Sequence, residues 1–361
     1  MRTQKTLRYA VIAVILLLGL VWSLASAQDG GQPYPNADFL ASPEWIRTET
    51  GADDVALVDV RTDEHFDGRL IPGAIRMPWS QFRYNDTARN IGDVFVGTAR
   101  AQEILGEHGI ARNDTVVLYD SVERDGGATA SYLFWVLEVL GHEEMKILER
   151  GIDAWIDAGG ETTDTPATRE AVLYQAPSNE IDLSKEVTGD FIRGRLGDPY
   201  YQILDVRSQA EYLGEAPNVA LNGMVLKLGH IPTAYNIDYT RNWADPEVKA
   251  LKSYADIQDI YRGIDPNRAV ITYCHSARRG SFGYFALRLM GFSDVRLYTG
   301  SWNEWGNKRF YYPVETEANL PAGKGLPGVT AQRATSGGQA GGMAPSSGSG
   351  GGKKGYISCG G

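Results

Sequence analysis

Short apolar runs alternate with longer apolar segments along most of the chain. The runs at residues 115–119 and 269–273 are rich in β-branched side chains and carry no charge, which predicts strands buried on both faces. The segments 130–140 and 282–290 have the length and apolar content of buried helices. This alternation predicts α/β domains, each with a mainly parallel sheet flanked by helices.

The pattern occurs twice in the same order. Asp59-Val60-Arg61 returns as Asp205-Val206-Arg207, and the apolar runs that contain them start 146 residues apart. The later matches pair residues 70–74 with 230–234, 115–120 with 269–274, 141–148 with 291–297, and Gly151 and Trp155 with Gly300 and Trp305. A period of this length predicts two duplicated domains and not a solenoid. We expect a first domain over residues 36–160, a polar connector over 161–184 and a second domain over 185–318. Residues 213–228 have no counterpart in the first copy, and we expect a surface loop that overhangs the site.

Both ends of the chain differ from this pattern. Residues 1–27 carry three basic residues, an apolar run of about 14 residues and a final Ala25-Ser26-Ala27, the order of an export signal cleaved after Ala27. We therefore expect an extracytoplasmic protein, periplasmic or secreted, and an uncleaved segment would instead attach it to a membrane. Residues 319–361 are rich in Gly and Ser, and we expect a disordered tail that carries Cys359.

Charge and cysteine content narrow the function classes. The chain has 35 Lys and Arg against 45 Asp and Glu, and removal of the signal would leave 32 − 45 = −13. It has no basic run longer than a pair, so nucleic acid is not an expected partner. Only two cysteines are present, Cys274 and Cys359, which excludes an intrachain disulfide scaffold and a four-cysteine zinc site.

Cys274 is the candidate nucleophile. It stands at the end of the predicted strand 269–273, and residues from Gly280 onward predict a helix, so residues 275–279 would form a short turn. Backbone amides of such a turn, the positive end of the helix, and Arg278 and Arg279 would all stabilise a thiolate. The two arginines also offer donors to a sulfonate, sulfate or phosphate.

These motifs make the chain resemble the tandem rhodanese family, the thiosulfate and 3-mercaptopyruvate sulfurtransferases, over roughly residues 36–315. The resemblance implies that Cys274 takes a sulfane sulfur as a persulfide and passes it to a thiophilic acceptor such as cyanide or a thiol. It implies that the donor is a small anion, that no metal or organic cofactor takes part, and that the first domain, with Asp120 in place of the cysteine, is catalytically silent. The loop residues expected to bind substrate are His275, Ser276, Ala277, Arg278, Arg279 and Gly280.

The loop also separates alternative functions. Phosphatases with a related loop place five residues between Cys and Arg, whereas Arg279 follows Cys274 after four and the next position is Gly280. Mercaptopyruvate-type loops usually read Cys-Gly-Ser-Gly-Val-Thr, so the two arginines favour thiosulfate. Vertebrate-type members carry an anion-binding Arg at the position of Glu211, and anion recognition would here rest on the loop alone.

Several other residues are expected to be structural, and other functions stay open. Asp59, Arg61, Asp205 and Arg207 predict ion pairs at strand ends, His230 a turn contact, and Trp302 and Trp305 core or pocket wall; His275 would tune the thiolate or line the site. A 3-mercaptopyruvate sulfurtransferase, a noncatalytic binding module and a structural protein with paired cysteines are the alternatives to thiosulfate transfer.

Overall fold

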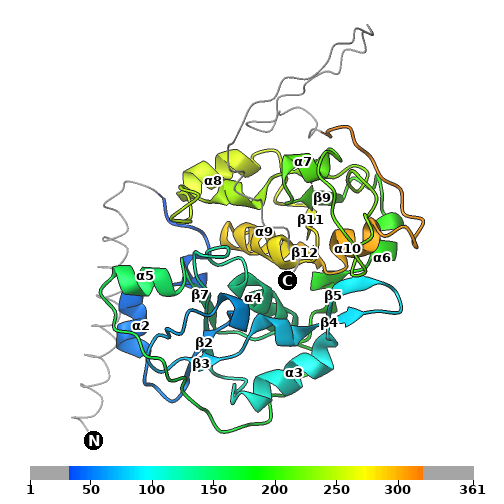
Figure 1. The fold of residues 1–361 in the computed structure, drawn as a ribbon. Helices are drawn as coiled ribbons and strands as arrows, with labels where there is room; N and C mark the ends of the chain where they lie inside the picture. The colour runs from blue at the N-terminus through cyan, green and yellow to red at the C-terminus, as the bar shows by residue number, and fades with distance from the viewer. Residues whose placement is uncertain (1–31, 320–361) are drawn as a thin grey trace, which may run out of the picture.

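The computed structural model describes residues 32–319 (Figure 1). The predicted export signal, the tail from residue 320 onward and Cys359 lie outside the described residues. Among the described residues, no helix is long and apolar enough to cross a membrane.

Two five-stranded sheets, one per domain, confirm the predicted α/β fold (Figure 1). In the first, the strand order is β1 (Leu40–Ala41), β7 (Met145–Leu148), β6 (Thr115–Tyr119), β2 (Val55–Asp59), β3 (Ile75–Arg76). In the second, the same order read from the other edge is β8 (Glu186–Val187), β12 (Val295–Tyr298), β11 (Ala269–Tyr273), β9 (Tyr201–Asp205), β10 (Tyr235–Asn236). Every neighbouring pair in both sheets is parallel.

Helices cover the sheets because the central strands are buried on both faces. All five residues of β11 are buried, as are four of the five in β2, β6 and β9. The helices of the first domain are α2 (Pro43–Glu49), α3 (Gly97–Glu107), α4 (Ala130–Val139) and α5 (Ile152–Asp157). Those of the second are α6 (Gly189–Arg193), α7 (Gln209–Tyr212), α8 (Tyr254–Tyr261), α9 (Arg278–Leu289) and α10 (Ser301–Trp305). An antiparallel pair, β4 (Arg83–Asp86) and β5 (Ile91–Phe95), lies outside the two sheets, and short 3-10 helices lie at Ala37–Phe39, Asp63–His65, Trp79–Phe82, Leu183–Lys185 and Tyr239–Asn242.

The two domains meet through α4 and α9, which lie next to each other in the middle of the molecule (Figure 1). The rings of Phe134 and Phe285 pack edge to face with centroids 5.0 Å apart. Glu138 on α4 accepts a hydrogen bond from the Tyr284 hydroxyl at 2.5 Å and pairs with Arg288 at 2.9 Å. All residues of α4 are buried, which explains why its sequence is apolar almost throughout instead of amphipathic.

The segment expected as a connector is ordered against the first domain. Tyr174 is buried and its ring stacks on His142, with centroids 5.9 Å apart. Arg169 pairs with the buried Asp114 at 2.7 Å. These contacts fix the path of the chain between the domains although the sequence there shows no periodicity.

Candidate active site

Cys274 lies directly after β11, and its side chain is fully buried. Four residues, 274–277, connect the strand to α9. Ala277, the last of them, has φ +70°, a left-handed conformation that is uncommon for a residue other than glycine. The thiol therefore stands beside the start of a 12-residue helix, where backbone amides and the helix dipole favour an anion.

The predicted start of this helix is wrong by two residues. The sequence predicts a turn that extends to Arg279, but α9 begins at Arg278, directly after the left-handed residue Ala277. Arg278 and Arg279 consequently lie in the first helical turn, and both side chains are about 1% exposed. They are thus part of the buried support of the loop, and not exposed members of the turn.

Ser301, at the start of α10, ties the ends of the loop together. Its Oγ accepts hydrogen bonds from the backbone amides of Cys274 at 3.2 Å and Ala277 at 3.0 Å, and donates one to the Tyr298 carbonyl at 2.8 Å. The amide of Trp302 also donates to the Cys274 carbonyl at 2.9 Å. Ser301 is therefore the residue that sets the spacing between the two ends of the loop.

Sequence comparison of the two halves missed Ser301 by one position. The sequence pairs Gly151 with Gly300, but in the structure the amide of Ile152 donates to the Asp120 carbonyl as the amide of Trp302 donates to the Cys274 carbonyl. Gly151 in the first domain is therefore equivalent to Ser301 in the second, and both have positive φ, +59° and +48°. The constant offset of 150 residues between Gly141 and Gly291, and between Trp155 and Trp305, was the signal that identifies this match.

Arg279 forms a two-point ion pair with Glu211. Its two terminal nitrogens lie 2.7 and 2.9 Å from the carboxylate oxygens of Glu211, which is also buried. Burial alone would raise the pKa of Glu211, but the Arg279 guanidinium and Arg207 outweigh it and hold that pKa well below its usual range. The glutamate that stands where vertebrate-type members carry an arginine is therefore the partner of a loop arginine.

Arg278 pairs with a residue of the first domain. Its guanidinium contacts the carboxylate of Asp125, and both side chains are buried. The other carboxylate oxygen of Asp125 accepts a hydrogen bond from the Tyr239 hydroxyl at 2.7 Å. The sequence showed no signal for this contact, because Asp125 lies 153 residues before Arg278 in a segment without periodicity.

The remaining loop residues are also brought together here. His275 lies with Nε2 3.1 Å from the Val219 carbonyl, so the loop at 213–228 does reach the catalytic loop. Ser276 is buried. At Gly280 a Cβ would meet Leu297 Cδ1 at 3.0 Å and the Tyr273 backbone at 3.4 Å, so glycine there allows α9 to approach β11 and β12. Contact of residues 275–280 with substrate stays a prediction.

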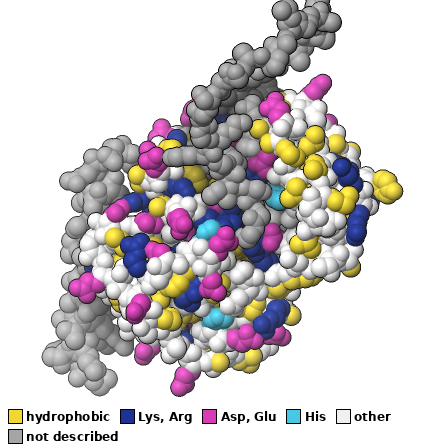
Figure 2. Space-filling model, viewed as in Figure 1, with side chains coloured by type: hydrophobic (Ala, Val, Ile, Leu, Met, Phe, Trp, Pro, Cys, Tyr) yellow, Lys and Arg dark blue, Asp and Glu magenta, His cyan; other side chains and the backbone are white. Residues whose placement is uncertain are grey.

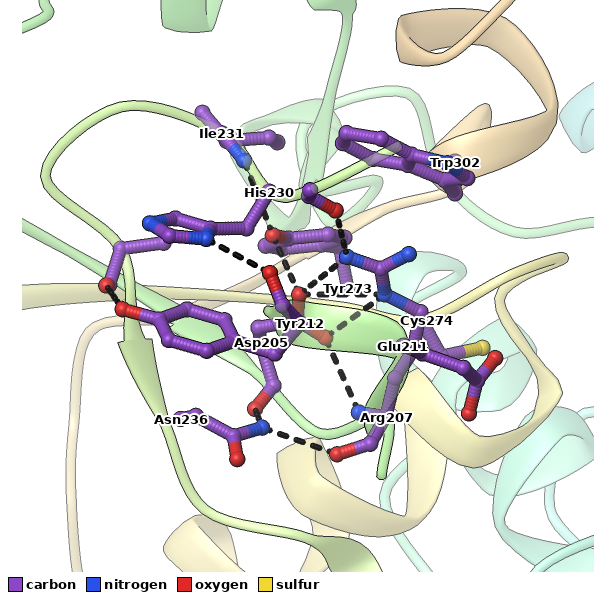
Figure 3. Close-up of polar contacts among 12 residues, drawn as sticks. Asp205, Arg207, Glu211, Tyr212, His230, Ile231, Asn236, Tyr273, Cys274 and Trp302 are labelled. Carbon is purple, nitrogen blue, oxygen red and sulfur yellow. Dashed lines mark hydrogen bonds and ion pairs between the residues drawn. The ribbon is translucent and has the colours of Figure 1, made fainter. Parts of the chain in front are cut away.

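A buried ion pair stabilises the strand end beside Cys274 (Figure 3). Asp205 accepts hydrogen bonds from the Arg207 guanidinium at 2.6 Å and from the Tyr273 hydroxyl at 2.6 Å. The Tyr273 hydroxyl in turn accepts the amide of Ile231 at 3.2 Å, and His230 Nδ1 lies 2.8 Å from the Tyr212 carbonyl. The structure thus shows the expected structural roles, and Asp59 and Arg61 form the same pair at 2.6 Å in the first domain.

Asp120 occupies the position of Cys274 in the first domain. Its Oδ2 accepts hydrogen bonds from the amides of Thr129 at 3.0 Å and Ala130 at 3.3 Å, at the start of α4. Complete burial raises the pKa of Asp120 to about 6, although these backbone amides oppose the shift. The first copy therefore shows an acidic side chain held between a strand end and a helix start.

Among residues 32–319, no group of three or more His, Cys, Asp or Glu side chains is placed to hold a metal ion. The arrangement instead offers one buried thiol, helix-start amides and two arginines that are each matched by a carboxylate.

Known proteins share both the domains and the sequence pattern. The profile of the rhodanese-like domain matches residues 42–158 and 189–308. A thiosulfate sulfurtransferase of Corynebacterium glutamicum is 30% identical over 298 residues, which cover 80% of this chain and 94% of that protein.

Two solved structures share the fold of this chain, and at 23% and 24% sequence identity they are evidence of the fold only. The wild-type structure of EanB has a TM-score of 0.67 and 24% identity, covering 80% of this chain and 71% of that one. An anaerobic ergothioneine biosynthesis enzyme from Chlorobium limicola has a TM-score of 0.65 and 23% identity, over 80% and 72% of the two chains. The sequence relatives support sulfurtransferase activity. Since the domain profile matches both halves of the chain, the protein belongs to the rhodanese family, as a member with two tandem domains.

Proposed function

We propose that the protein moves a sulfane sulfur from thiosulfate to a thiophilic acceptor through a persulfide on Cys274. The thiolate attacks the outer sulfur of thiosulfate, a new S–S bond forms on Cys274, and the old S–S bond breaks to release sulfite. Attack by an acceptor, cyanide or a thiol, on the outer sulfur of the persulfide then gives thiocyanate or a new persulfide and regenerates the thiolate. No external oxidant or reductant is needed.

The position of Cys274 between β11 and the start of α9 carries this proposal. In the first domain the same position holds the Asp120 carboxyl group, which accepts two helix-start amides. The duplicated architecture thus holds an acidic side chain beside helix-start amides in the first copy, and the second copy places at the same position the one side chain of the pair that can form a covalent bond to sulfur. The name of the Corynebacterium relative supports thiosulfate as the donor.

A 3-mercaptopyruvate donor remains the second candidate, and one observation favours it. The preference for thiosulfate rested on the positive charge of Arg278 and Arg279, but Asp125 and Glu211 each balance one of these charges. A site with little net charge has less reason to select a dianion over a monoanion.

Steady-state sulfur transfer to cyanide from each donor tests the assignment. We expect thiocyanate from thiosulfate with the higher kcat/KM, and loss of turnover with both donors in Cys274→Ser, because a hydroxyl is neither acidic nor soft enough to hold the sulfur. Asp120→Asn, the matched variant in the first domain, should retain turnover. Cyanide-dependent thiocyanate formation that persists in Cys274→Ser would exclude the proposed mechanism.

A further inference from the structure

The loop of the first domain that corresponds to the catalytic loop is much longer than its counterpart. Ten residues, 120–129, connect β6 to α4, whereas four residues, 274–277, connect β11 to α9. The additional residues are not needed to hold Asp120 at the helix start, because a four-residue loop performs the same connection in the second copy. They extend from the first domain to the second.

The second domain holds this long loop in place. Lys249 donates hydrogen bonds from Nζ to the carbonyls of Val122 and Arg124, the second at 2.9 Å. A Cβ at Gly126 would lie 2.7 Å from Lys249 Cβ, so the glycine permits the close approach of the two chains. Lys249 itself is held in a left-handed conformation, with φ +54°. The loop is therefore fixed from the side of the catalytic domain.

Asp125 is the residue that this arrangement presents to the catalytic loop. It is 4% exposed, and its carboxylate lies between the Tyr239 hydroxyl and the Arg278 guanidinium. On the face drawn in Figure 2, acidic and basic side chains lie interspersed over the described surface. Two buried ion pairs, Arg278 with Asp125 and Arg279 with Glu211, thus lie beside the loop, and in each pair the two charges balance.

We propose that Asp125, supplied by the first domain, is a specificity-determining residue of the site at Cys274: by balancing the charge of Arg278 it reduces the advantage of multiply charged anions over less charged reagents. The first domain thus sets the electrostatic selectivity of the second, beyond packing against it. The part of this proposal that concerns sulfur donors rests on the proposed function, whereas charge selectivity at Cys274 requires only that the thiol reacts.

Alkylation of Cys274 measures this selectivity without any sulfur transfer. The rate with iodoacetate, an anion, is divided by the rate with neutral iodoacetamide, and peptide mapping separates Cys274 from Cys359. In Asp125→Asn the uncompensated Arg278 should raise this ratio about tenfold. Asp259→Asn, which removes an exposed carboxylate paired with Arg262, should leave the ratio unchanged.

The double variant Asp125→Asn/Arg278→Gln removes both charges, so its ratio should return to that of the wild type. It also keeps the test valid if the single variant, with a buried unpaired arginine, does not fold. A ratio that stays constant in Asp125→Asn, a double variant shifted more than threefold from the wild type, or a Cys274 that reacts with neither reagent would overturn the proposal.

The donor measurement then follows the same charges. In Asp125→Asn, KM for thiosulfate should fall several-fold more than KM for mercaptopyruvate, with kcat changed less than KM. Equal changes for both donors would overturn the donor part. A raised alkylation ratio in a protein that transfers no sulfur would refute the proposed function and leave the role of Asp125 intact.

Discussion

Asp120→Asn should stabilise the folded protein relative to the wild type, and this stabilisation should be larger at neutral pH than at acidic pH. Burial raises the pKa of Asp120 to about 6 from an ordinary value of 3.8. Between these two values the folded protein holds a proton that the unfolded chain has released. The free energy of unfolding of the wild type must therefore fall as the pH rises through this window.

The magnitude follows from the shift of about 2 pKa units. At about 1.4 kcal/mol per unit, the carboxylate of Asp120 costs the folded state about 3 kcal/mol at pH 7, a small part of that at pH 4, and almost nothing well below the ordinary pKa of 3.8. Asparagine keeps an oxygen that can accept the amides of Thr129 and Ala130 but carries no charge. The difference in unfolding free energy between variant and wild type should thus grow by about 2 kcal/mol in favour of the variant between pH 4 and pH 7.

Urea unfolding followed by tryptophan fluorescence, at half-unit steps from pH 4 to pH 7, measures this difference. Asp53→Asn, which changes an exposed carboxylate in the same domain, controls for the loss of one charge and should show a flat profile. A difference between Asp120→Asn and the wild type that does not change with pH, or that changes in favour of the wild type, would refute the reasoning.

Two further predictions concern the supports of the catalytic loop. Glu211→Gln should reduce the free energy of unfolding at pH 7 by about 3–5 kcal/mol, because it leaves the buried Arg279 without its carboxylate. The control Glu215→Gln, at an exposed position, should change it by less than about 0.5 kcal/mol. Equal stability of the two variants in urea unfolding would contradict the ion pair. Ser301→Ala should lower kcat for sulfur transfer by about ten- to a hundredfold, because the amides of Cys274 and Ala277 lose the hydroxyl that holds the two ends of the loop together. An unchanged kcat would show that the hydroxyl does not shape the loop.

The strongly periodic parts of the chain could be predicted from the sequence. The strand at Ala269–Tyr273 has the predicted bounds, and α4 at Ala130–Val139 is one residue shorter than expected. Both elements are apolar throughout, and burial decides their conformation. The edge strands β1, β3, β8 and β10 have two residues each and were not predicted, because two residues are too few to show a period.

The candidate site could be predicted only where its residues are neighbours in the chain. Residues 274–280 are recognisable in the sequence because Cys274, two arginines and Gly280 lie close together after an apolar strand. Asp125 was not, because its contact with Arg278 depends on how two domains pack. Glu211 stands where vertebrate-type members carry an arginine, and a carboxylate at that position, with two arginines in the catalytic loop, is itself a signal for an ion pair.

The central claim is that Cys274 carries the transferred sulfur. Incubation of the purified protein with thiosulfate, removal of the excess, and mass measurement of the intact chain and of its peptides without reductant test it most directly. We predict a gain of one sulfur atom on the peptide that contains Cys274, loss of that gain on addition of cyanide, and no gain in Cys274→Ser. A protein that gains no sulfur, or that gains it on a peptide without Cys274, would contradict the account.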